Sequence, residues 1–137
     1  MKKLITLMAV ATLLIFSLSS CKKTDEIQTP KTVIQKMQAN WQLSNYYGND
    51  HFGGADHITN ITGTAGDYIE FRTDGKVYYS IQGNKDTTTY SLLTDIQFLI
   101  GGSMKYDIKT LTDNGFIFYG KDVSGADFLE ETFTMKK

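Results

Sequence analysis

Apolar and polar residues alternate along the chain from Trp41 onward, and turn-forming residues recur about every ten positions. A period of two is typical of strands that bury one face, and many short strands at this spacing predict an all-β sandwich or barrel. Short connections between successive strands favour antiparallel neighbours. We therefore expect eight strands in an antiparallel meander, at residues 41–47, 67–72, 76–82, 87–92, 95–100, 104–111, 115–121 and 127–135.

The turn at residues 73–75 sets the pairing of the two strands beside it. A three-residue loop ending in glycine pairs Phe71 with Val77 and Ile69 with Tyr79. All four side chains then lie on one face, which a two-residue loop does not achieve. We expect the three-residue, bulged form.

The turn at residues 113–115 predicts the same geometry further along the chain. There Thr110 would lie opposite Phe118, and Thr112 opposite Phe116. With both turns in place, one face of every strand forms a consistent apolar set, and this inward set is Trp41, Leu43, Ile69, Phe71, Val77, Tyr79, Ile81, Tyr90, Leu92, Ile96, Phe98, Ile100, Met104, Tyr106, Ile108, Phe116, Phe118, Leu129, Phe133 and Met135. Such a division into inside and outside is what a small closed barrel requires.

A short helix precedes the first strand, at residues 30–40. Pro30 suits a first helical position with Thr29 as its cap, and Asn40 tolerates the left-handed turn that ends a helix. The apolar face of this helix is expected to cover the core, and it consists of Val33, Ile34 and Met37.

The first twenty residues have the layout of a secretory signal. Lys2 and Lys3 precede an uncharged, apolar run at residues 4–20, which is too short and wrongly flanked for a membrane span. The run ends in Leu18-Ser19-Ser20-Cys21, which resembles the lipobox of bacterial lipoproteins. This resemblance implies cleavage before Cys21, acylation of its sulfur, and a membrane anchor. Residues 1–20 are then the signal peptide and residues 21–30 a lipidated tether.

Lys22, rather than an aspartate, follows the cysteine. In the lipoproteins that this sequence resembles, an aspartate there can retain the protein in the inner membrane. The resemblance therefore implies the outer membrane, with the domain facing either the periplasm or the cell surface.

Composition narrows the possible chemistry of the domain. Without Lys2 and Lys3, 12 positive residues face 15 negative ones, and no basic block is present, which argues against nucleic acid as a partner. Cys21 is the sole cysteine, and lipidation would consume it, so no disulfide or cysteine metal site is expected. No Gly-x-Ser-x-Gly elbow occurs either, and we expect neither an enzyme nor a cofactor.

Several short motifs along residues 31–137 resemble the lipocalin-like domains of Bacteroidetes lipoproteins. These motifs are Trp41-Gln42-Leu43, Tyr68-Ile69-Glu70-Phe71 with Asp74-Gly75-Lys76-Val77, Tyr90-Ser91-Leu92, and Ile108-Lys109-Thr110-Leu111-Thr112 with Phe116-Ile117-Phe118. The resemblance implies an eight-stranded up-and-down barrel preceded by a short helix.

The inward aromatic residues indicate a binding function, because a barrel of eight strands can hold one small ligand. We expect a small apolar or amphipathic molecule, contacted by Trp41, Tyr79, Tyr90, Tyr106, Phe118, Glu131 and Phe133. Glu131 is the one charged residue on the inward side and would supply a polar contact. A core filled by these large side chains, with no cavity, is an equal alternative.

The longest segment without a strand pattern is residues 48–66, which is rich in glycine and holds both histidines. We expect a loop at the barrel mouth that gates the ligand. The repeated pairs Asp50-His51 and Asp56-His57 could bind a divalent metal, but their spacing matches no established ligand pattern, so a solvated loop without metal is preferred.

A second function also fits the sequence, namely an interaction or inhibitor module that contacts another protein of the cell envelope. Three tyrosines expected on the outer face suggest it, Tyr46, Tyr78 and Tyr119.

Overall fold

The computed structural model describes residues 30–137, and the expected signal peptide, the acylated Cys21 and the tether up to residue 29 lie outside the described residues. The described chain contains one helix and nine strands: α1 (Val33–Met37), β1 (Asn40–Phe52), β2 (Ala55–Thr62), β3 (Tyr68–Phe71), β4 (Lys76–Ile81), β5 (Asn84–Thr94), β6 (Gln97–Ile100), β7 (Met104–Leu111), β8 (Gly115–Ser124) and β9 (Asp127–Lys136). No helix among these residues is long and apolar enough to cross a membrane.

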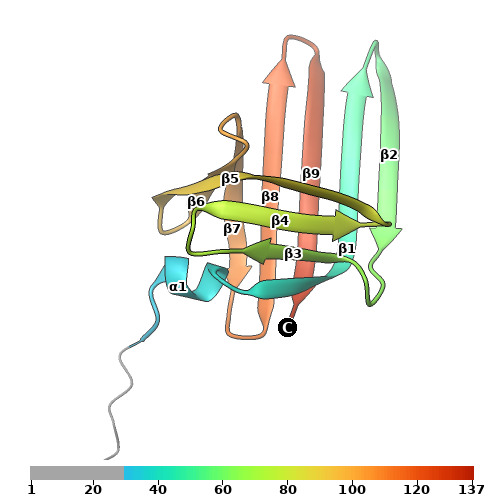
Figure 1. The fold of residues 1–137 in the computed structure, drawn as a ribbon. Helices are drawn as coiled ribbons and strands as arrows, with labels where there is room; N and C mark the ends of the chain where they lie inside the picture. Colours follow the sequence, from blue (N-terminus) through green and yellow to red (C-terminus); the bar gives the residue numbers. More distant parts are fainter. Residues whose placement is uncertain (1–29) are drawn as a thin grey trace, which may run out of the picture.

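Eight of the strands form a closed antiparallel barrel (Figure 1). Strand β1 pairs with β3, each of β3 to β8 pairs with the strand that follows it, and β9 returns to pair with β1. The predicted all-β barrel with a short N-terminal helix is therefore confirmed. The barrel closes on itself, and its core is drawn from residues 33–135.

The ninth strand, β2, replaces the loop expected at residues 48–66, and that prediction is wrong. Strand β1 continues to Phe52 and turns back through Gly53 and Gly54, whose φ angles are 62° and 80°. Two consecutive residues with positive φ make the two-residue hairpin turn that matches strand twist, and glycine adopts it without strain. Strands β8, β9, β1 and β2 lie side by side and extend beyond the barrel as a four-stranded sheet, which we call the extension (Figure 1).

A bulge in β1 reverses the side-chain pattern of this strand. The β1–β9 register shifts between Leu43 and Asn45, so Ser44 is an extra residue. Side chains alternate along a strand, and one extra residue sends every later one to the opposite face. Trp41 and Leu43 are buried in the core as expected, but Tyr46, expected on the outside, faces the interior.

The two predicted turns differ in outcome. At residues 73–75, Phe71 pairs with Val77 and Ile69 with Tyr79, as predicted. At residues 113–115 the predicted register is wrong, because Ile108 pairs with Phe118 and Leu111 with Phe116.

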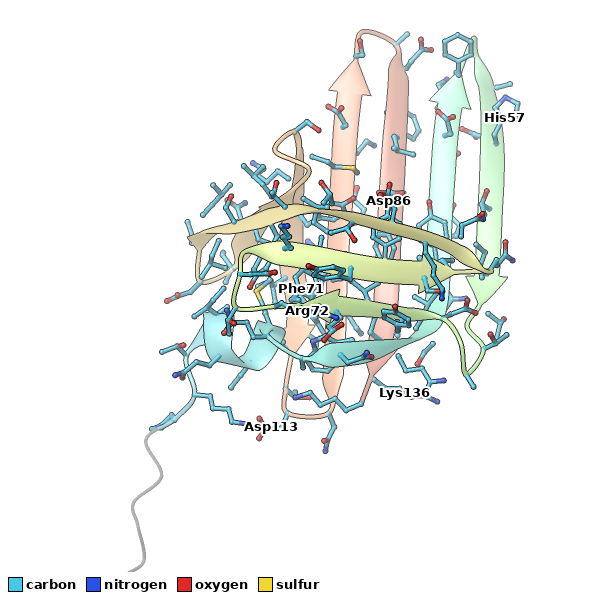
Figure 2. The ribbon with its side chains drawn as sticks, viewed as in Figure 1. His57, Phe71, Arg72, Asp86, Asp113 and Lys136 are labelled. Atoms are coloured by element: carbon cyan, nitrogen blue, oxygen red, sulfur yellow. The ribbon has the colours of Figure 1, made fainter. Side chains whose placement is uncertain are left out.

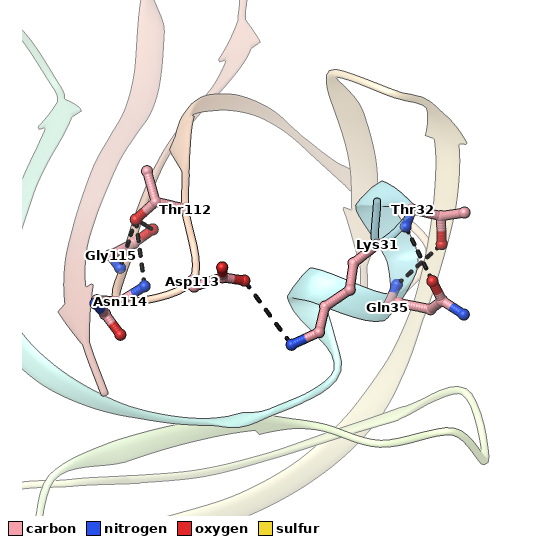
Figure 3. A network of polar contacts seen from close by, with 7 residues as sticks. All are labelled: Lys31, Thr32, Gln35, Thr112, Asp113, Asn114 and Gly115. Atoms are coloured by element: carbon pink, nitrogen blue, oxygen red, sulfur yellow. Dashed lines mark hydrogen bonds and ion pairs between the residues drawn. The ribbon is translucent and has the colours of Figure 1, made fainter. Parts of the chain in front are cut away.

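The second turn is held by Thr112, whose hydroxyl accepts hydrogen bonds from the backbone of Asn114 (3.3 Å) and Gly115 (2.9 Å) (Figure 3). Thr112 thus belongs to the turn. Lys109 is an extra residue in β7, so that Leu111, and not Thr110, shares the inward face with Ile108.

Helix α1 is shorter than predicted and starts later. Its cap is Thr32, not Thr29, because the Thr32 side chain accepts from the Gln35 backbone (3.4 Å) while the Gln35 side chain accepts from the Thr32 backbone (2.9 Å) (Figure 3). This reciprocal capping box satisfies two backbone donors at once. The helix ends at Met37, and Asn40 begins β1 instead of ending the helix.

The core fills the end of the barrel that α1 covers, which we call the helix end. Met37 and Trp41 are fully buried there, and the Trp41 indole donates to the Met37 carbonyl (2.9 Å). Aromatic rings fill the space behind them, namely Phe71, Phe98, Phe116 and Phe118. Two residues expected inside are exposed instead: Ile96 lies in the turn between β5 and β6, and Leu129 lies in the extension.

Candidate functional site

A cavity of about 370 Å³ lies at the other end of the barrel, which we call the open end. Its mouth includes the exposed Gln82 and Asn84 beside the turn between β4 and β5, and its deeper wall includes the buried Ile69 and Val77. The complete lining is Tyr46, Ile61, Ile69, Val77, Tyr79, Ile81, Gln82, Asn84, Thr88, Ile100, Tyr106, Glu131 and Phe133. The size and the mainly apolar wall match those of small-molecule pockets.

Glu131 on β9 is the polar centre of this cavity. The hydroxyl of Tyr46 on β1 donates to one carboxylate oxygen (2.8 Å), and the hydroxyl of Tyr106 on β7 donates to the other (2.6 Å). These three side chains form what we call the carboxylate bridge. Because each oxygen is held from a different strand, the carboxylate is fixed in position toward the cavity.

Two glycines make room for the carboxylate bridge. Gly48 on β1 and Gly120 on β8 pair with Glu131 from its two sides. A Cβ atom on Gly48 would lie 2.5 Å from the Tyr46 hydroxyl, and one on Gly120 would lie 2.6 Å from the Tyr106 ring. Each tyrosine therefore lies directly over a glycine, and a larger residue would displace it.

Both bridging tyrosines hold their protons strongly. Burial raises the pKa of Tyr106 far above its usual value, and the charge of Glu131 and the hydrogen bond to it act in the same direction. Burial also raises the pKa of Tyr46, followed by its hydrogen bond to Glu131 and the charges of Glu131 and Asp50. Both phenols consequently remain donors at any physiological pH.

Asp67 fixes the backbone at the mouth of the cavity. Its carboxylate accepts from the backbone and hydroxyl of Thr64 (both 2.8 Å) and from the backbone of Gln82 (2.6 Å). Gln82 has a φ of 51°, a left-handed conformation that non-glycine residues rarely adopt, and this hydrogen bond holds it there. The same hydrogen bonds, with that from the Thr64 backbone the largest cause, lower the pKa of Asp67.

Four of the seven predicted ligand contacts line the cavity, namely Tyr79, Tyr106, Glu131 and Phe133. The other three do not. Trp41 and Phe118 are fully buried in the core, and Phe118 stacks on Phe133 from behind at a centroid distance of 4.7 Å. Tyr90 lies at the helix end, where its hydroxyl donates to the Arg72 carbonyl (2.8 Å).

Tyr46 and Ile61 also line this cavity, and neither was predicted from the sequence to contact a ligand. The bulge at Ser44 turns Tyr46 inward, and Ile61 follows because it pairs with Tyr46 across the hairpin. A signal was present, since continuing the strand pattern through the Gly53-Gly54 turn as a hairpin places Ile61 opposite Tyr46.

The two histidines lie on the extension, away from the cavity lining. His51 contacts Asp56 across the hairpin (Nδ1–Oδ1, 2.7 Å) and stacks on Phe128, while His57 pairs with Asp50 in the strand register. Among residues 30–137, no group of three potential ligands from His, Cys, Asp and Glu lies close enough to hold a metal ion.

No family model matches this chain, and no curated protein matches it. Support for a function therefore comes from the cavity and the side chains around it.

Proposed function

We propose that this protein is a lipoprotein of the cell envelope whose barrel binds a small apolar or amphipathic molecule. The observation that carries this proposal is the cavity of about 370 Å³ with the carboxylate bridge at its polar centre. Eight-stranded barrels have just enough interior for side chains to fill it, so a space of this size at one end favours a ligand site.

Binding without catalysis is the function that this lining supports. In the described part of the chain, the cavity lining includes no histidine, serine, cysteine or lysine that could act as a nucleophile or general base beside Glu131. The two tyrosines that touch Glu131 are held in their protonated form, which suits fixed hydrogen-bond donors better than proton carriers. Binding and release of an intact ligand needs nothing more.

Retention of a ligand during purification tests the proposal. Residues 22–137 should be purified from a cell extract without denaturation and measured by native mass spectrometry beside a denatured control. We expect an extra mass that denaturation removes.

A pair of neighbouring residues on β5 supplies matched variants. Thr88 lines the cavity, whereas Thr89 is exposed on the outer face. Thr88→Trp should fill the cavity and abolish the extra mass, while Thr89→Trp should retain it. A bare polypeptide mass from the wild type, together with no uptake of added 1-octanol, would contradict the proposal.

A protein-interaction function is supported by a different observation. Large apolar side chains are exposed along the extension, including Phe52 (67%), Ile58 (63%) and Val123 (60%). Of the three tyrosines that suggested this function from the sequence, Tyr46 lines the cavity instead. Capture of a specific envelope protein that is lost on Phe52→Ser and Val123→Ser would favour this alternative.

A further inference from the structure

Among the residues that the structure describes, the cavity lining contains one charged side chain and no cationic one. Glu131 is the only ionisable acid or base of the lining apart from the neutral tyrosines. Its two hydrogen-bond donors are uncharged hydroxyls, and none of the ion pairs formed within residues 30–137 involves it. A carboxylate offers about four lone-pair positions, of which the bridge uses two. Glu131 therefore presents both charge and free acceptor positions to a ligand.

The surroundings of the mouth are acidic as well. Asp86 on β5 accepts a hydrogen bond from the Tyr79 hydroxyl (3.2 Å), and Figure 2 shows Asp86 at the edge of the barrel from which the extension rises. Residues two apart on a strand share a face, so Asp50 on β1 lies on the same side as Tyr46. By the same rule Asp122 on β8 follows Gly120 on the side that holds Glu131.

The lysines of these strands lie on the opposite face. Lys121 alternates with Gly120 and pairs with Glu130 on the outside (3.3 Å), and Lys85 alternates with Asp86. His57 is the one basic residue on the inner side of the extension, opposite Asp50. Negative charges around a cleft with low-dielectric walls concentrate cations and repel anions.

We propose that the ligand is an organic cation, a molecule with an ammonium group attached to an apolar body. The ammonium would bind the free acceptor positions of Glu131, and the body would pack on the isoleucine and valine side chains of the wall. This inference rests on the proposed function and names the chemical class of its ligand. Hydrogen bonds between ionised partners are about twice as strong as neutral ones, and the cation also neutralises the half-buried charge of Glu131. The aromatic rings of Tyr46, Tyr79 and Tyr106 add surface that favours cations.

Three ligands that differ only in their head group test the proposal. n-Octylamine is cationic at neutral pH, 1-octanol is neutral and octanoate is anionic, while the apolar chain is the same. Isothermal titration of each into residues 22–137 at neutral pH gives the order of affinity. We expect n-octylamine to bind roughly tenfold or more tightly than 1-octanol, as a charge-assisted hydrogen bond predicts, and octanoate to bind most weakly.

Two neighbouring glutamates provide the variant and its control. Glu131→Gln keeps the size of the side chain and its ability to bond both tyrosines, but removes the charge from the cavity. Glu130→Gln removes the same charge from the outer face of β9, where Glu130 contacts Lys121 and Tyr119. We expect Glu131→Gln to erase the preference for the amine while 1-octanol still binds, and Glu130→Gln to leave the preference intact.

The outcomes separate the two proposals. Equal binding of all three ligands, or tightest binding of octanoate, overturns the cationic ligand and leaves the cavity as a binding site. A preference for the amine that both glutamate variants weaken equally overturns it too, because attraction would then come from net charge alone. Failure of every ligand to bind the wild type overturns the proposed function itself.

Discussion

At the scale of single residues, the carboxylate bridge decides the properties of the open end. A half-buried carboxylate without donors would be costly, and the hydroxyls of Tyr46 and Tyr106 replace the water that it would otherwise require. Since each tyrosine approaches a different oxygen, neither can leave without exposing one oxygen to an apolar wall. The bridge therefore supports a fixed acceptor and not a mobile one.

The raised pKa values of these tyrosines predict a loss of stability in alkali. In the folded state each phenol keeps its proton at a pH where the unfolded chain, with a pKa near about 10, releases it. The unfolded state then binds fewer protons, so the free energy of unfolding is unaffected below about pH 10 and falls above it. The slope contributed by Tyr106 should approach about 1.4 kcal/mol per pH unit. The pKa of Tyr46 is raised less, because solvent screens it more, so its contribution ends at a lower pH.

Urea unfolding between about pH 8 and about pH 11 measures this slope. The Tyr106→Phe variant, which has no proton to lose at this position, should show a shallower decline than the wild type. An identical decline in both proteins would show that Tyr106 does not hold its proton more strongly when folded.

Glu131 and Tyr106 could be placed on the inward side from sequence, whereas Tyr46 could not. A charged residue that falls on the inward side of a strand stands out against Phe133 and Met135, whose alternation is unbroken. Tyr46 follows a bulge, and nothing local in the sequence marks Ser44 as an extra residue. The position of the bulge is set by the pairing of β1 with β9, whose residues are far apart in the chain.

At the scale of elements, close contacts between neighbouring strands determine where the cavity lies. The ring of Tyr106 on β7 crosses over Gly120 on β8 and reaches Glu131 on β9, so one side chain spans three strands. This crossing is possible only because β8 has no Cβ atom at that position.

Gly120→Ala should therefore destabilise the barrel. Its Cβ would meet the Tyr106 ring at 2.6 Å and the end of the Met104 side chain at 2.8 Å. Overpacking of this kind costs about 1–3 kcal/mol, and urea unfolding would measure it. Gly66→Ala is the matched control, because a Cβ there meets nothing within 4 Å, and we expect a change within about 0.5 kcal/mol. Equal stability of the two variants would contradict the crossing of Tyr106 over β8.

The expected gating loop shows why elements can be misjudged from local composition. Residues 48–66 hold five glycines and few large apolar residues, which is typical of an irregular segment. Only two of these glycines, Gly53 and Gly54, form the turn. Gly48 lies inside β1 under the Tyr46 ring, where a contact between side chain and backbone requires it. Glycine at position 48 therefore permits close packing of a side chain against the strand. This role can be recognised only once the pairing of the strands is known.

At the scale of the whole molecule, the barrel has one packed end and one open end. Helix α1, Trp41 and the phenylalanine cluster fill the helix end, whereas the carboxylate bridge and aliphatic residues leave space at the other. The list of inward residues predicted the barrel but not this division, because alternation assigns a side chain to a face and says nothing of its height along the barrel axis. The height of each side chain along the axis determines which end of the barrel is filled and which is hollow.

The anchor predicted at Cys21 can be tested separately from the barrel. Acyl chains contribute about 0.8 kcal/mol for each buried methylene, so a multiply acylated chain should stay with the membrane until detergent releases it. Cys21→Ala should appear in the soluble fraction and take up no labelled palmitate. Since the barrel is built from residues 30–137, the variant should keep the unfolding midpoint and the ligand preference of an unacylated chain of residues 22–137.

This comparison also distinguishes anchoring from other membrane attachment. The exposed apolar side chains of the extension, such as Phe52 and Val123, offer a second route to a lipid surface. A Cys21→Ala variant that remains in the membrane fraction would overturn the lipid anchor as the sole attachment. Adding Phe52→Ser and Val123→Ser to it would then show whether the extension is responsible, because acylation and apolar contact fail in different variants.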